Sequence, residues 1–408
     1  MNTRLQTAKY TSKYAAIQGS YWSIYCASGS FISVFLLSKH FTNSNIGIIL
    51  AVANIISVFL QPAIATFADT TKQITLKNLS ALLSFIGALA AAAVIISSGQ
   101  KVLLSIFLVL ELTILYTLQP LTNSLGMRLI NKGVPLNFGL ARGIGSITFT
   151  VCSYVIGVLI ERFGADSTLI VALVLLFAYT FFALTLASNQ YFKNAPSESS
   201  EQDLINEAKP LGVWGFAMKY KRFMLLVLAI TMTFISHVLI NNYFIQIVEN
   251  VGGNTKDMGM VVGYAAAIEL PVMAIFSLLS RKFRCSSMLR FSLLFFVIKT
   301  ALTAIATNVG MLFLAQTMQF GAYALFIPAS IYYVNQIIEE TDLVKGQAFI
   351  TLAITIAGVL ASLVGGIILD GAGVYAMLYV GVLASIIGFI LSLPAISKTP
   401  KPAHKTAA

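Results

Sequence analysis

The feature that most constrains this chain is a succession of continuous apolar stretches, each about 20 residues long, which is the length of one membrane-spanning α-helix. Because the stretches do not alternate in polarity, they exclude a transmembrane β-barrel. Only 10% of the 408 residues are charged, whereas soluble domains carry about 25%. The chain is therefore predicted to be an integral membrane protein that lies in a lipid bilayer.

Twelve of these stretches are predicted to be transmembrane helices, six on each side of one long polar segment. They lie near residues 14–37, 45–68, 74–97, 102–127, 136–160, 167–187, 223–248, 258–280, 288–306, 311–338, 343–369 and 374–393. The predicted fold is an all-α membrane protein with two six-helix, pseudo-symmetric bundles. The N-terminal bundle covers 1–188, a cytoplasmic linker 189–221, and the C-terminal bundle 222–408.

An internal repeat supports the division into two halves. At an offset of 208 residues, Gly157 lies over Gly365 and Pro120 over Pro328. Each match is weak alone, because glycine and proline are common in membrane helices. Their shared register indicates duplicated halves of the same orientation, as in transporters built from parallel repeats.

The basic residues set the orientation. Of the 26 lysines and arginines, 20 fall in the termini and loops of one predicted side, and four (Lys39, Lys101, Arg162 and Lys256) fall on the other. Cytoplasmic loops are enriched in lysine and arginine. We therefore expect a multi-pass protein of the cell membrane with both termini in the cytoplasm. The basic residues are dispersed among short loops, so they do not indicate binding to nucleic acid.

Four charged residues lie within predicted spans: Glu111, Arg142, Glu269 and Lys299. Each would cost several kcal/mol if it faced lipid. Two acids and two bases are consistent with a polar interior cavity. The alternative is that they form structural ion pairs or lie near a membrane interface.

Uncharged polar residues form stripes along several predicted helices. In the first span they recur at helical spacing and so lie on one face. Such stripes favour a shared aqueous cavity for a polar solute, although single amides also join helices to one another. His237 is a candidate proton relay, ligand contact or hydrogen-bond partner. The candidate solute-binding residues are Gln18, Tyr21, Trp22, Tyr25, Gln119, Asn123, Arg142, Asn241, Gln316, Gln319 and Tyr323, and the candidate proton-coupling residues are Glu269, Lys299, His237 and Glu111.

Motifs of ATP-driven or metal-dependent enzymes are absent from the sequence. It has no Gly-Lys dipeptide and so no P-loop, and it has no H-E-x-x-H motif. We expect no catalytic residues, no metal and no cofactor, and hence no enzyme. A channel is conceivable, but no repeated filter loop or charged ring is visible.

The segment N-F-G-L-A-R-G-I-G-S, residues 137–146, resembles the F-G-x-x-R-x-x-G-[SC] motif of the major facilitator superfamily, in its oligosaccharide:proton symporter and lactose-permease-like group. The resemblance implies that Arg142 is a sugar-binding arginine. Glu269, before Leu270 and Pro271, is similar to the group's glutamate in the eighth helix, and Lys299 matches a basic position in the ninth.

The sequence also departs from that group. Asn123 stands where the group's galactoside-binding carboxylate is found, and Gln319 and Ala322 stand in place of a histidine and a glutamate. These departures argue against a galactoside and imply that proton coupling depends mainly on Glu269.

The predicted function is a monomeric secondary transporter that imports a small polar solute by proton symport with alternating access. A sugar or oligosaccharide is favoured over a nucleoside. The alternatives are a proton-coupled exporter of amphipathic compounds or metallophores, and a non-transporting sensor with a carrier fold.

Overall fold

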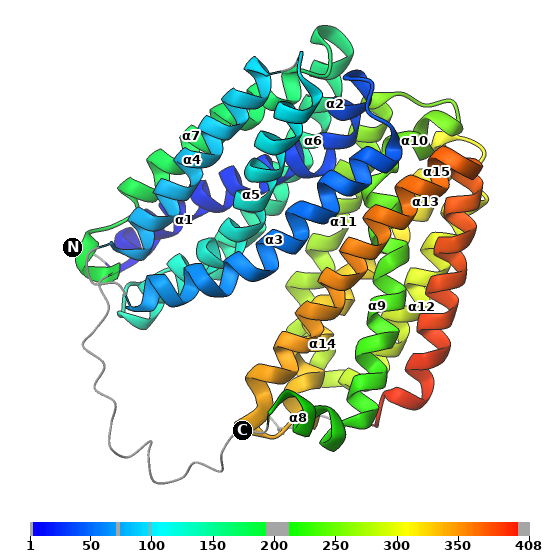
Figure 1. Cartoon of the computed structure of the whole chain (residues 1–408). Coiled ribbons are helices and arrows are strands. Elements are labelled where there is room, and N and C mark those ends of the chain that lie inside the picture. The colour runs from blue at the N-terminus through cyan, green and yellow to red at the C-terminus, as the bar shows by residue number, and fades with distance from the viewer. Residues whose placement is uncertain (1–2, 71–73, 98, 193–211, 399–408) are drawn as a thin grey trace. The chain divides into compact units, whose positions relative to one another are not determined.

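The computed structural model describes residues 3–70, 74–97, 99–192 and 212–398, which form helices and connecting turns (Figure 1). It divides into two compact units, Met1–Glu198 with Asn254–Ala267, and Ser199–Gly253 with Ile268–Ala408. Most of the predicted linker, 193–211, lies outside the described residues. The ends of this linker are helical, in η2 (Asn189–Phe192) and α8 (Val213–Lys219).

The first unit is built from six membrane-spanning segments. Its helices are α1 (Thr3–Ile24), which continues through a π-helical segment η1 (Tyr25–Ser30) into α2 (Ile32–Ser38), then α3 (Asn43–Thr70), α4 (Leu76–Ile96), α5 (Lys101–Asn131), α6 (Phe138–Phe163) and α7 (Ser167–Thr185). α4 packs against α5 and α7, α3 against α5, and α1 against α6 and α7. Predicted as one regular helix, the first span instead contains a π-helical turn.

The helices of the second unit are interrupted more often. They are α8, α9 (Lys221–Asn242), α10 (Phe244–Asn250), the second half of α11 (Thr255–Lys282), α12 (Cys285–Ala304), α13 (Val309–Thr317), the 3₁₀ turn η4 (Met318–Phe320), α14 (Tyr323–Ile337), the 3₁₀ turn η5 (Glu340–Asp342) and α15 (Leu343–Ala395). The predicted continuous tenth span is broken between α13 and α14. The Ala322 carbonyl at this break accepts from the Phe326 nitrogen at 3.0 Å and also from the Ser292 hydroxyl on α12 at 2.8 Å, which ties the break to α12.

The prediction of twelve transmembrane helices is confirmed. Among the described residues, eleven helices are long and apolar enough to cross a membrane, and one of them, α15, has 53 residues. A helix of that length would extend about 80 Å, far more than a bilayer needs. Gly373 interrupts α15 with φ 81° and ψ −178°, a conformation open to glycine, so α15 contains two spans. The break falls between the predicted spans 343–369 and 374–393.

α11 does not lie wholly in the second unit, as the predicted C-terminal bundle, 222–408, would require. Its first half, Asn254–Ala267, belongs to the first unit. The cause is close packing on α6, where the Ser153 hydroxyl donates a 2.8 Å hydrogen bond to the Gly259 carbonyl. A side chain at Gly157 would meet the Thr255 carbonyl at 2.8 Å, so the contact requires small residues.

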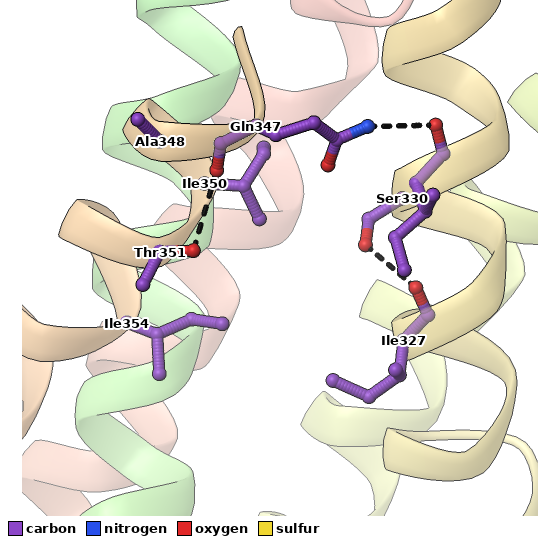
Figure 2. A pocket seen from close by; sticks show the side chains of 8 residues that line it. Ile327, Ser330, Gln347, Ala348, Ile350, Thr351 and Ile354 are labelled. Carbon is purple, nitrogen blue, oxygen red and sulfur yellow. Dashed lines mark hydrogen bonds between the residues drawn. The ribbon is translucent and has the colours of Figure 1, made fainter. Parts of the chain in front are cut away.

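A groove lies between α14 and α15 in the second unit (Figure 2). Its lining is mainly aliphatic, with Ile327, Ile350 and Ile354 among the residues drawn. Gln347 crosses one end, where its amide donates to the Ile331 carbonyl at 3.1 Å. None of the predicted site residues lines this groove, so we do not assign the solute site to it.

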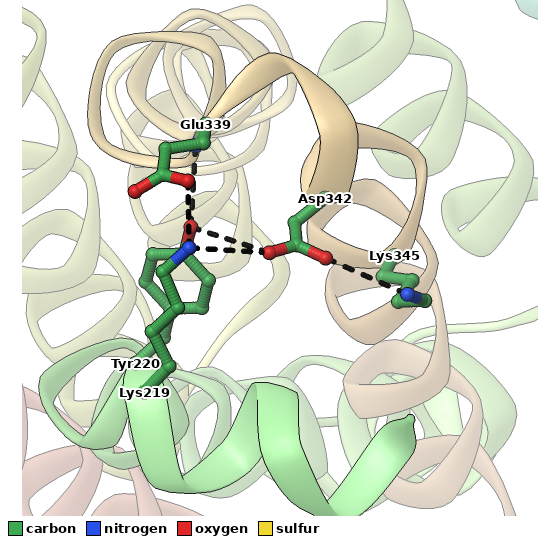
Figure 3. Close-up of polar contacts among 5 residues, drawn as sticks. All are labelled: Lys219, Tyr220, Glu339, Asp342 and Lys345. Atoms are coloured by element: carbon green, nitrogen blue, oxygen red, sulfur yellow. Dashed lines mark hydrogen bonds and ion pairs between the residues drawn. The ribbon is translucent and has the colours of Figure 1, made fainter. Parts of the chain in front are cut away.

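An ionic cluster joins α8 to the turn between α14 and α15 (Figure 3). The Lys219 ammonium lies 2.6 Å from a Glu339 carboxylate oxygen and 3.5 Å from one of Asp342. The hydrogen bond to Glu339 raises the pKa of the Lys219 ammonium above its ordinary value. Asp342 is buried and also faces Lys345, at 3.5 Å. The cluster therefore fixes the described end of the linker to the second unit.

Packing of α15 on α9 gives a test of the second unit. A Cβ at Gly388 would meet the Ala229 carbonyl at 2.7 Å and the Thr233 backbone nitrogen at 2.8 Å, and neither backbone atom can rotate away. We expect Gly388→Ala to lower the free energy of unfolding by about 1–3 kcal/mol, as overpacking does. The measurement is thermal unfolding of the purified protein in detergent. Gly371→Ala on the same helix is the control, because a Cβ there meets nothing within 4 Å. Equal midpoints for the two variants would contradict the prediction.

Candidate functional site

Arg142 is held against an aromatic ring in the first unit. Its guanidinium carbon lies 4.1 Å from the centre of the Trp22 ring, and one of its nitrogens donates to the Ser146 hydroxyl at 3.1 Å. Stacking of this kind satisfies a cation without neutralising it. Gly145 makes the arrangement possible, because a Cβ there would lie 2.6 Å from the Trp22 ring. α1 and α6 can therefore approach closely enough to bring Trp22 and Arg142 together.

A chain of hydrogen bonds fixes the Trp22 ring in place. The indole nitrogen donates to the Gln18 amide oxygen at 3.2 Å, and the Gln18 amide nitrogen donates to the Tyr14 hydroxyl at 2.7 Å and the Asn123 amide oxygen at 3.3 Å. Tyr14 in turn donates to the Thr122 carbonyl at 3.0 Å. Gln18 and Tyr14 are fully buried, whereas Asn123 is exposed and Trp22 partly exposed. The network presents an indole face and an amide at its accessible edge.

Three tyrosines extend the aromatic part of this cluster. The ring centre of Trp22 lies 5.3 Å from that of Tyr21 and 5.6 Å from that of Tyr25, and Tyr25 lies 6.5 Å from Tyr116 on α5. We call the residues Gln18, Trp22, Tyr25, Asn123 and Arg142 the first cluster. It unites five predicted solute-binding residues from α1, η1, α5 and α6. Tyr21 is buried beside it.

The second unit joins its two intramembrane charges through an amide. The Gln319 side chain donates to a Glu269 carboxylate oxygen at 2.7 Å and accepts from the Lys299 ammonium at 2.6 Å. Lys299 is 1% exposed and Gln319 is 6% exposed, while Glu269 is partly exposed. Charge-assisted hydrogen bonds of this kind are stronger than those between neutral groups. We call Glu269, Gln319 and Lys299 the second cluster.

His237 occupies an aromatic site on α9. Its ring stacks on Tyr323 with centres 5.3 Å apart and an interplanar angle of 21°, and its Nε2 lies 3.1 Å from the Asn241 amide nitrogen. Among the described residues, Nδ1 is buried without a hydrogen-bond partner. Three predicted residues, His237, Asn241 and Tyr323, thus form a separate group.

Besides Tyr21, three predicted residues lie outside these groups. Gln119 is exposed on α5, one turn before Asn123. Gln316 is buried on α13, one turn before Gln319. Glu111 is 1% exposed on α5 and lies near η1.

Sequence reasoning did not select some residues that hold these clusters together. Tyr14 lies on the polar stripe of the first span, and that spacing was the available signal. Tyr116 and Ser146 gave no comparable signal. Gln319 was predicted to bind solute, and the structure adds that it bridges two charges. Within the part of the chain that the structure describes, no group of three or more metal-ligating side chains is present.

Comparisons with known proteins agree with this architecture. The sequence model of the MFS_1 like family matches residues 14–380. The uncharacterized transporter YwbF of Bacillus subtilis is 24% identical over 395 residues, which are 93% of this chain and 92% of that protein. The maltose permease of Geobacillus stearothermophilus is 24% identical over 331 residues, 78% of each chain. A crystal structure of a mutant nucleoside transporter NupG superposes with a TM-score of 0.76 at 17% identity and covers 97% of this chain and 99% of that one.

The bridge through Gln319 generates a stability prediction. Gln319→Leu removes the acceptor of the buried Lys299 ammonium, and breaking a buried charged contact by removing one partner costs about 3 kcal/mol or more. We expect a clear fall in the thermal midpoint of the purified protein. The double variant Gln319→Leu with Lys299→Met should recover most of the loss, because no buried cation is then left. Gln316→Leu, at a buried position one turn earlier, is the control and should stay close to the parent. A Gln319→Leu midpoint equal to that control would show that the bridge contributes nothing.

Proposed function

Because this chain belongs to the MFS_1 like family of major facilitator transporters, we propose that it imports a small polyhydroxylated solute, a sugar or oligosaccharide, by proton symport with alternating access. Membrane transport is the general activity of the family. The solute, the direction and the coupling ion are the proposal.

The stacked pair of Arg142 and Trp22 carries the proposal for the solute. A planar guanidinium donates two parallel hydrogen bonds and so suits adjacent hydroxyls, while an indole face suits the apolar face of a sugar ring. Asn123, an amide, supplies a neutral donor and acceptor at the same edge. The hydrogen bonds that hold Gln18, Trp22 and Asn123 are with neutral groups, and such donors and acceptors suit an uncharged polar solute.

The relatives support the same class of solute. One is named a maltose permease, and the fold is shared with a protein named a nucleoside transporter. Sugars and nucleosides both carry vicinal hydroxyls. A nucleoside is the second candidate, because the neighbouring rings of Trp22, Tyr25 and Tyr116 offer aromatic faces for a base.

Proton coupling is proposed for the second cluster. When Glu269 is ionised, its carboxylate is a strong acceptor for the Gln319 amide. Protonation removes the negative charge and weakens that bond. Gln319 lies in η4, at the break between α13 and α14. Protonation of Glu269 therefore weakens a hydrogen bond that holds the chain at this break. A bound proton can thereby favour one conformation of the carrier over another.

Uptake into proteoliposomes tests the proposed function. A panel of labelled sugars and nucleosides is offered with and without an inward proton gradient. Accumulation of a sugar only with the gradient supports the proposal, and accumulation of a nucleoside selects the second candidate. Gradient-driven loss of amphipathic compounds or metallophores from preloaded vesicles would indicate an exporter. Tight binding without any transport would indicate a sensor.

The role of Arg142 gives a binding prediction. The chain has two tryptophans, Trp22 and Trp214, so Trp22 is the sole indole in a Trp214→Phe variant. Solute that covers Trp22 should change its fluorescence. Arg142→Lys replaces the planar fork by a point charge and should weaken solute binding at least about tenfold, or about 1.4 kcal/mol. Arg162→Lys, near the end of the same helix, is the control with unchanged affinity. Unchanged affinity in Arg142→Lys would assign the arginine a structural role only.

Glu269→Gln tests coupling. Glutamine mimics the protonated carboxyl and cannot release a proton, so this variant should lose proton-driven accumulation while it still exchanges solute across the membrane. Glu161→Gln, at an exposed position on α6, should accumulate solute normally. The measurement is uptake and counterflow in the same vesicles. If Glu269→Gln still concentrates solute with only a proton gradient as the driving force, Glu269 is not the coupling acid.

A further inference from the structure

Glu111 is a buried acid that neither cluster uses. It lies on α5 and is 1% exposed. Among the described residues, both of its carboxylate oxygens lack a hydrogen-bond partner. Ser28 of η1 is fully buried and its hydroxyl interacts with this carboxyl, although no hydrogen bond of ordinary geometry joins the two groups. Buried polar atoms are nearly always satisfied, so three orphaned oxygens at one place need an explanation.

Charged side chains on the elements packed against α5 are remote from Glu111. On α3, the Ala53 carbonyl accepts a hydrogen bond from the Thr113 hydroxyl, and residues 43–68 of this helix include no charged residue. On α4, Gly87 packs on Ile114, and Lys77 lies ten residues away, roughly 15 Å.

The remaining titratable groups around α5 are neutral or lie at its other end. Tyr116 is on α5 itself, Tyr21 is on α1, and Tyr25 and Cys26 are on η1. Tyr191 of η2 lies near Arg128, whose guanidinium donates to the Phe192 carbonyl.

An ionised carboxylate in such a site would cost many kcal/mol without compensation. None of the described side chains on the helices packed against α5 is a cationic partner of Glu111, so we assign the compensation to a cation from outside the protein. A single negative charge is balanced by a single positive charge, whereas a divalent ion would leave an excess charge in the same apolar surroundings. We propose that Glu111 and Ser28 form a second ion site, which holds a small monovalent cation, either a proton or Na⁺.

The backbone at Ser28 fits an ion site. In η1 the hydrogen bonds are displaced by one residue, as in the bond from the Phe31 nitrogen to the Cys26 carbonyl at 3.2 Å. Single π-helical turns of this kind occur frequently at functional sites, and irregular backbone in transporters supplies carbonyl oxygens to cations.

Ser28 and Glu111 also lie at a similar depth along the helices of the first unit. Ser28 lies ten residues before Ser38, where α2 ends, and Glu111 lies ten residues after Lys101, where α5 begins, so each is roughly 15 Å from the same end of the unit. The predicted orientation makes this the outer end, from which an ion would enter. As a second coupling ion, this site rests on the proposed transport function.

The test uses purified protein without solute, so it does not depend on sugar uptake. Infrared difference spectra between the parent and Glu111→Gln report the carbonyl band of a protonated Glu111. Thermal unfolding in Na⁺ or choline at equal ionic strength reports Na⁺ binding. Ser28→Ala is the second variant, in case Glu111→Gln does not fold, and Glu161→Gln is the control.

Two results support the site and identify its ion. A Glu111 band that disappears reversibly as the pH is raised identifies a proton. Stabilisation by Na⁺ over choline that is lost in Glu111→Gln and reduced in Ser28→Ala identifies Na⁺. A band that persists unchanged at alkaline pH without any effect of Na⁺ would show a permanently neutral acid and overturn the proposal, as would the absence of both signals. Neither result alters the outcome expected for Glu269→Gln. The ion site at Glu111 and proton coupling by Glu269 can therefore be disproved independently of each other.

Discussion

The cost of a charge inside a bilayer governs the arrangement of this protein. A cation facing hydrocarbon is expensive, so each one must find compensation within its own unit. Arg142 stacks on Trp22 and donates to Ser146. Lys299 reaches Glu269 through the Gln319 amide. Arg142 is thus held by an aromatic face and a hydroxyl, whereas Lys299 and Glu269, which carry opposite charges, are joined through a neutral amide.

Several of the polar residues in the two units lie where a helix is irregular. An ordinary α-helix uses its backbone groups internally and offers only side chains. Tyr25 and Ser28 lie in the π-helical segment η1, and Gln319 lies in the 3₁₀ turn η4. At the break between α13 and α14, the Ala322 carbonyl accepts one hydrogen bond from the Phe326 nitrogen of α14 and a second from the Ser292 hydroxyl of α12. A helix interrupted in this way can exchange its backbone hydrogen bonds at low cost. A carrier needs this property where a proton or a solute binds.

The sequence predicts the spans well, because a bilayer imposes a length and an apolar composition that can be read without the fold. It also singles out Arg142, Glu269 and Lys299, because charges in apolar segments are rare. It does not predict that the Gln319 amide joins Lys299 to Glu269. Gln319 lies 50 residues from Glu269 and 20 from Lys299, and no local sequence pattern indicates a contact at that separation. The breaks in the first and tenth spans are not predicted either, although the two spans that contain them are less apolar than the other candidate spans. The π-helical turn is a property of packing between α1 and its neighbours, which hydropathy does not report.

The two units differ in how their acids are treated, and this difference bears on the mechanism. Glu269 is partly exposed and is held by an amide that also holds a cation, so its protonation changes a contact with another helix. Glu111 is buried, and both of its carboxylate oxygens lack a hydrogen-bond partner among the described residues. In the proposed mechanism, a proton on Glu269 acts on conformation through Gln319. A cation at Glu111 acts by removing a charge that the apolar interior would otherwise exclude, and so stabilises the packing of α5 against η1.

In this scheme Glu269 couples its proton to movement, and Glu111 couples its cation to the stability of the first unit. Loss of either should therefore give a different defect: uncoupled exchange in one case, and a loss of ion-dependent stability in the other.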